Sequence, residues 1–168
     1  MDFFEVVEKR QSVRKYAARA VEPGQLNRIL EAANRAPSAG NFQSYEIYVV
    51  SGEERRKALA AATFEQDFVA QAPVLLVFCT NPARCEYATR EVCALEDASI
   101  ACTFAMMAAT ALGLSSCWVG AFRPDAVAGV LGCPAGIVPA AILTIAYPDE
   151  QPERTTRREI RDLVHFAR

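Results

Sequence analysis

The sequence has a single histidine, and its six cysteines include no Cys-X-X-Cys pair. Zinc sites are built from closely spaced cysteine and histidine ligands, so we expect no metal site. No histidine, serine or cysteine stands in a recognised nucleophile or general-base motif. The sequence therefore predicts no catalytic side chain, and we interpret most of the cysteines as small core residues.

Targeting and nucleotide-binding signals are also missing. Residues 1–8 mix acids with apolar residues and lack the basic start and apolar run of a secretory signal, which favours a cytoplasmic protein. A formal net charge of −2 and a pI near 5.5 argue against a general nucleic-acid or membrane surface. No Gly-X-Gly-X-X-Gly motif is present, so we expect no Rossmann fold for a dinucleotide.

Charged residues are absent from the long stretch 98–122, which is long enough to span a membrane. Small residues dominate it, Gly113 and the pair Ser115 and Ser116 interrupt it, and no aromatic belt flanks it. We therefore expect no membrane span and predict a buried helix over 86–112. Such a helix needs cover on all sides, and a second subunit could supply part of that cover.

The remaining pattern predicts one domain, 1–168, with mixed helices and strands. A length of 168 residues and 52% hydrophobic content suit a single domain with a sizeable core. Asp2 and Glu5 form a capping-box signature, and Pro23 suits the first turn of a helix. Besides 86–112, the pattern predicts helices over 2–9, 23–36, 53–62 and 124–131, strands over 45–50, 73–79 and 140–146, and a short strand or turn over 116–119.

Three polar side chains alternate in the segment 9–16, namely Arg10, Ser12 and Arg14. In an extended backbone all three point to one face. Guanidinium forks match the oxygens of a phosphate, and the hydroxyl adds a neutral donor. The segment is either an anion clamp for a phosphorylated ligand or a solvated basic turn.

A second segment, 36–43, predicts the end of a helix and the approach to a strand. Pro37 and Gly40 break regular structure, and the small residues let a flat ligand approach the backbone. Asn41 and Gln43 carry amides that can donate and accept toward a ring edge such as a flavin pyrimidine. Taken alone, this segment is a turn.

Together the two segments resemble the start of the nitroreductase family, which binds flavin mononucleotide (FMN). Members typically show Arg-X-Ser-X-Arg early and Ala-Pro-Ser-X-X-Asn-X-Gln after the next helix. The resemblance continues through 113–120, 139–148 and 157–165, and so covers nearly the whole chain. It implies an α+β fold with a central, mostly antiparallel sheet flanked by helices. It also implies an intertwined homodimer with FMN at the interface, and a C-terminal arm, 148–168, that reaches the partner subunit.

The resemblance assigns roles to particular residues. Arg10, Ser12 and Arg14 would hold the FMN phosphate, joined by Arg157 or Arg158. Glu159 stands where the family has a proline, which favours Arg157 but leaves the register open by one residue. A loop of the partner subunit would line the flavin ring with Pro37, Ser38, Ala39, Asn41 and Gln43. The backbone N–H groups of Gly120 and Ala121 would face the ring near N5.

The family's function follows from its cofactor, which carries the hydride chemistry. The implied reaction takes hydride from NADH or NADPH, bound transiently, and passes it by a ping-pong mechanism to a nitroaromatic, a quinone or a similar small acceptor. The alternative is a non-catalytic flavin-binding protein for storage or sensing, which the lack of a catalytic side chain favours. Nucleic-acid binding through 9–15 and 154–161 is disfavoured by the acidic balance.

Overall fold

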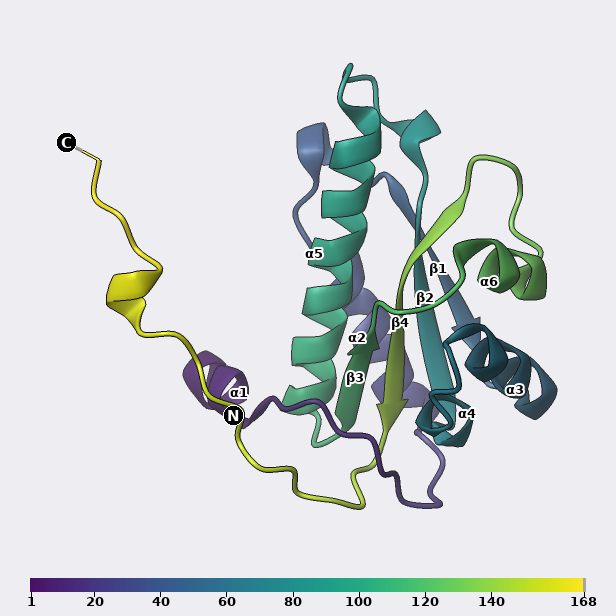
Figure 1. The fold of residues 1–168 in the computed structure, drawn as a ribbon, viewed down its shortest axis with the longest axis vertical. Coiled ribbons are helices and arrows are strands. Elements are labelled where there is room, and N and C mark those ends of the chain that lie inside the picture. Colours follow the sequence, from purple (N-terminus) through teal and green to yellow (C-terminus); the bar gives the residue numbers. More distant parts are fainter. Residues whose placement is uncertain (168) are drawn as a thin grey trace.

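The computed structural model describes residues 1–167, and its centre is a four-stranded antiparallel sheet (Figure 1). The strand order is β1-β2-β4-β3, which agrees with the mostly antiparallel sheet that we expected. The continuous apolar run predicted as a strand is the inner strand β2, buried on both faces except at its last residue. The strands are β1 (Tyr45–Val50), β2 (Val74–Thr80), β3 (Ser115–Val119) and β4 (Val138–Ala146).

Helices cover both faces of this sheet. On one face α2 (Pro23–Asn34) and α5 (Arg90–Ala111) enclose a hydrophobic cluster that includes Phe78 and Leu143, both fully buried. On the other face α3 (Glu53–Ala62), α4 (Phe68–Gln71) and α6 (Pro124–Leu131) enclose a second cluster. Figure 1 shows these two helical layers with the sheet between them. The expected α+β architecture is confirmed.

The capping signals act as the sequence indicates. In α1 (Phe3–Lys9), Asp2 and Glu5 each accept the other's backbone N–H at 2.9 Å, which completes the capping box. Pro23 is the first residue of α2. The short helix α4 and three 3₁₀ turns were not predicted, because each is too short to show a period: η1 (Ala39–Asn41), η2 (Pro82–Arg84) and η3 (Ile160–Asp162).

Helix α5 corresponds to the long apolar stretch, but it begins at Arg90 and not at residue 86. The preceding Tyr87 packs edge-on against the ring of Phe42, with centroids 5.2 Å apart. By length and composition α5 is the one helix in residues 1–167 that could cross a membrane, yet its small residues pack against the sheet and α2. Cover on all sides is not found in the single chain, since Val92 and Leu95 are 57% and 51% exposed.

After β4 the chain leaves the body of the fold as an extended arm (Figure 1). Its apolar side chains lie in solvent, with Ile160 76% and Phe166 87% exposed. Arg154 forms an ion pair with Glu8 of α1 at 3.3 Å, which ties the first part of the arm to the body. The final residue of the expected arm, Arg168, lies outside the described residues.

Candidate functional site

The segment 10–16 touches the edge strand β3 at one isolated bridge and then pairs with the chain just after β4, where Tyr16 bridges Pro148. Ser12 forms a parallel bridge with Ser116, and the Val13 N–H donates to the Ser116 carbonyl at 3.2 Å. Val13 is buried. Arg10, Ser12 and Arg14 all line one cavity of about 500 Å³, together with Arg157 from the arm.

The charge of this cavity suits a phosphate. Its lining contains four arginines and two glutamates, a net of +2, and a phosphomonoester carries about −1.5 to −2 at neutral pH. Within residues 1–167, no carboxylate lies within ion-pair distance of Arg10, Arg14 or Arg157. The donor set therefore fits a phosphorylated ligand such as FMN, because guanidinium and hydroxyl groups are what phosphate oxygens accept from.

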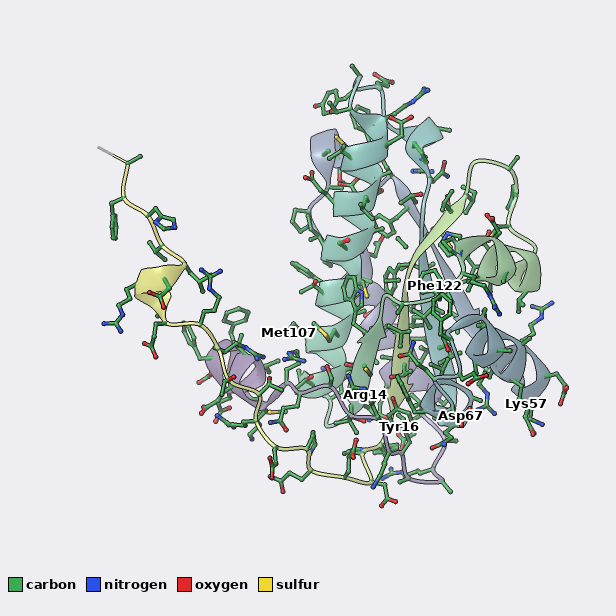
Figure 2. The ribbon with its side chains drawn as sticks, viewed as in Figure 1. Arg14, Tyr16, Lys57, Asp67, Met107 and Phe122 are labelled. Carbon is green, nitrogen blue, oxygen red and sulfur yellow. The ribbon has the colours of Figure 1, made fainter. Side chains whose placement is uncertain are left out.

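Two side chains that the sequence did not single out hold this segment in place. Glu150 Oε1 accepts the backbone N–H groups of Arg14 at 2.6 Å and of Lys15 at 3.0 Å. The Tyr16 hydroxyl donates to the Val13 carbonyl at 2.8 Å and is hydrogen-bonded to Thr144 Oγ1 at 2.7 Å. Burial raises the pKa of Tyr16 above its ordinary value. Figure 2 shows Arg14 and Tyr16 near the same end of the sheet.

The positive charge of the arginine segment also affects the pKa of a buried thiol behind it, that of Cys117. Cys117 on β3 is 2% exposed, and burial raises the pKa of its thiol. Arg14 opposes that rise by charge and Ser12 opposes it by a hydrogen bond. The cysteine is thus a packed neighbour of the cavity wall, and its raised pKa does not favour a reactive thiolate.

The loop of residues 37–44 has an unusual backbone. Gly40, Asn41 and Gln43 have positive φ values of 53°, 57° and 50°. Ser38 Oγ accepts the Gln43 N–H at 3.1 Å. Pro37, Gly40 and Asn41 are exposed, so part of this loop faces away from the fold.

One chain does not bring the two halves of the expected site together. The loop lies beside Asp97 in the first half of α5, whereas the arginine segment lies near Thr110 at the other end of that helix. At 1.5 Å per residue these points on α5 are about 20 Å apart. No residue of the loop 37–44 lines the arginine cavity of the same chain.

Gly120 and Ala121 follow directly after β3, and both are exposed. Along the strand, Gly120 lies about 13 Å from the Ser12–Ser116 bridge. Gln66 holds this segment, because its Nε2 donates to the Ala121 carbonyl at 3.0 Å and to the Thr63 carbonyl at 2.8 Å. Nothing in the sequence pattern marked Gln66 for this task.

The two arginines left open by the sequence occupy different places. Arg157 lines the cavity, and its Nη1 donates to Thr155 Oγ1 at 2.6 Å. Arg158 is not part of the cavity lining and donates to the backbone carbonyl of Asp162. This placement favours Arg157 as the arginine that contributes to the cavity.

The fold and the cavity define an α+β protein whose sheet edge carries a cationic site for an anionic ligand. The chain belongs to the nitroreductase family, because the model of that family matches residues 7–66 and 60–147. It is 30% identical over 164 residues to an FMN reductase [NAD(P)H] of Bacillus subtilis, covering 88% of this chain and 66% of that protein. It is also 30% identical over 174 residues to an NADH dehydrogenase of Thermus thermophilus, covering 85% of each. Nitroreductase A of Vibrio parahaemolyticus superposes with a TM-score of 0.93 at 25% identity, over 98% of this chain and 75% of that one.

Proposed function

We propose that this chain is a single-domain, cytoplasmic oxidoreductase that uses FMN and NAD(P)H and acts as a homodimer. The observation that carries the proposal is the cavity in which Arg10, Ser12, Arg14 and Arg157 converge, and whose whole lining has a net charge of +2. Family membership and the FMN- and NAD(P)H-named relative from Bacillus subtilis support the same ligand.

In this proposal the arginine cavity binds the phosphate of FMN, and the exposed segment at Gly120 lies beside the flavin ring. FMN, when bound, accepts hydride from NADH or NADPH and delivers it to a second substrate. Backbone N–H groups at Gly120 and Ala121 are rigid donors, and rigid donors stabilise negative charge as it develops on a ring. Gln66 keeps these donors in place through its hydrogen bond to the Ala121 carbonyl.

A second subunit completes the site. The loop 37–44 is held at Asp97, about 20 Å along α5 from Thr110 beside the arginine segment, so the loop that lines the ring comes from the partner. The exposed outer face of α5 and the exposed apolar side chains of the arm, 148–168, are the surfaces that the two subunits bury together. Exposed large apolar side chains gathered on one helix face and one arm are typical of protein interfaces.

The acceptor is a flat, electron-poor compound such as a nitroaromatic or a quinone. Such a compound would bind by stacking on the open face of the flavin ring. Donor and acceptor use the same place in turn, which gives ping-pong kinetics.

The test is the absorption spectrum of the purified protein before and after anaerobic addition of NADH or NADPH. We expect a bound-flavin spectrum that bleaches on mixing, within milliseconds to seconds by stopped flow. A protein that binds flavin but does not bleach would be a storage or sensor protein. A colourless protein that does not quench added FMN fluorescence would contradict flavin binding altogether.

A further inference from the structure

A carboxylate is buried beneath the loop that faces the partner. Asp97, on the inner side of α5, is 1% exposed. Its Oδ1 accepts the Ala39 N–H at 2.9 Å, and its Oδ2 accepts the Ser44 N–H at 3.1 Å. Within residues 1–167 no lysine or arginine forms an ion pair with it. Burying a charge is costly unless it is hydrogen-bonded, so the two backbone donors account for this residue's position.

The stretch between those two donors is the part of the loop with a strained backbone. Asn41 and Gln43 have φ values of 57° and 50°, a region that residues with a Cβ rarely adopt. Such conformations persist only where the surroundings hold them. Asp97 ties down the first residue and the last residue of this stretch, one with each oxygen.

We propose that Asp97 is a positioning residue that holds residues 39–44 in their ring-lining shape before flavin binds. The proposal rests on the proposed function, in which this loop packs against the FMN of the partner subunit. Asp97 acts only through the backbone of Ala39 and Ser44 and does not itself touch the ligand. If the loop already has its binding conformation in the free protein, no binding free energy is spent on ordering it, and the affinity for flavin is higher.

The chemistry of the carboxylate is specific to this task. Two acceptor oxygens are needed for two N–H groups that point at Asp97 from different residues. The amide of asparagine has one acceptor oxygen, and its NH₂ group would face the second N–H. Asp97→Asn therefore releases one end of the loop without changing the volume of the side chain. Glu31→Gln is the control, because Glu31 is an exposed carboxylate on α2 and does not belong to the face of α5 that the two subunits bury.

The experiment titrates each dimer with FMN and with riboflavin, which lacks the phosphate, at a temperature where circular dichroism shows every variant folded. We expect Asp97→Asn to raise both dissociation constants at least tenfold and Glu31→Gln to change neither by more than twofold. Arg14→Ala, in the phosphate cavity, should weaken FMN and leave riboflavin unchanged. The ratio of the two affinities thus separates the ring end of the site from the phosphate end.

The outcomes distinguish the two proposals. Wild-type protein that binds neither flavin overturns the proposed function, and this inference with it. If the wild type binds both flavins and Asp97→Asn binds them equally well, the positioning role alone is overturned, even if the variant melts at a lower temperature. A loss of affinity for FMN but not for riboflavin in Asp97→Asn also overturns the positioning role alone. If Asp97→Asn does not fold, amide exchange in the flavin-free wild type decides. Protected Ala39 and Ser44 amides support the inference, and exchange at unprotected rates until FMN is added overturns it.

Discussion

Replacing Tyr16 by phenylalanine removes the hydroxyl that fastens the arginine segment to the sheet. That hydroxyl makes two hydrogen bonds, at 2.8 Å to the Val13 carbonyl and at 2.7 Å to Thr144 Oγ1. With about 1 kcal/mol net for each bond, we expect a loss of about 2 kcal/mol of stability. For a domain of this size that loss lowers the melting temperature by about 4–8 °C.

The pH dependence adds a second expected result. Burial raises the pKa of Tyr16 in the folded state above the ordinary value near 10. Its contribution to stability is therefore complete below pH 10 and is lost as pH rises above the unfolded pKa, because only the unfolded chain releases the proton easily. Between pH 10 and pH 11, the free energy of unfolding of the wild type should fall by about 1 kcal/mol more than that of Tyr16→Phe.

Urea unfolding at pH 8, 10 and 11 measures both effects. Tyr87→Phe is the matched control, since Tyr87 is 49% exposed and contacts Phe42 through its ring. We expect that control to stay within about 0.5 kcal/mol of wild type. Equal stability of Tyr16→Phe and wild type at pH 8, or identical losses above pH 10, would refute the assignment of these hydrogen bonds.

Three further predictions concern the cavity and the loop. In FMN titrations at low salt, Arg157→Ala should raise the dissociation constant about ten- to a hundredfold, and Arg158→Ala should raise it less than about twofold, since only Arg157 of the two lines the cavity. Equal effects of the two substitutions would contradict this placement. In urea unfolding, Glu150→Ala should lower the free energy of unfolding by about 1–2 kcal/mol, because two backbone N–H groups lose a charged acceptor. Glu150→Gln should recover part of that loss, and a free energy of unfolding of Glu150→Ala equal to that of the wild type would argue against the contact. Gly40→Ala should lower the melting temperature and weaken FMN binding, because a Cβ there would lie 2.6 Å from the Phe42 ring at a φ of +53°; a fully stable variant would show that the loop adapts.

Much of the fold could be predicted because its signals are local. The capping box at Asp2, Pro23 at the start of α2 and the apolar run of β2 each act within a few residues, and these elements lie where expected. The strand order β1-β2-β4-β3 depends on pairings between distant segments, which periodicity does not encode. The 3₁₀ turns and α4 are too short for a periodic pattern.

The candidate site divides in the same way. Arg10, Ser12 and Arg14 alternate in the sequence, so their shared face could be predicted, and the structure brings them to one cavity. Asp97 and Glu150 could not be predicted, because each acts on backbone N–H groups that are far away in the sequence. The one available signal was an acid on the otherwise apolar inward face of α5, where burying a charge is costly unless hydrogen bonds satisfy it.

The separation of about 20 Å along α5, from the loop at Asp97 to the arginine segment near Thr110, has a genetic consequence. Every working centre would be a composite, with its phosphate end from one polypeptide and its ring end from the other. When a chain damaged at Arg14 is co-expressed with a chain damaged at Asp97, a mixed pair carries both lesions in one centre and neither in the other. Two inactive alleles would then restore part of the activity by interallelic complementation.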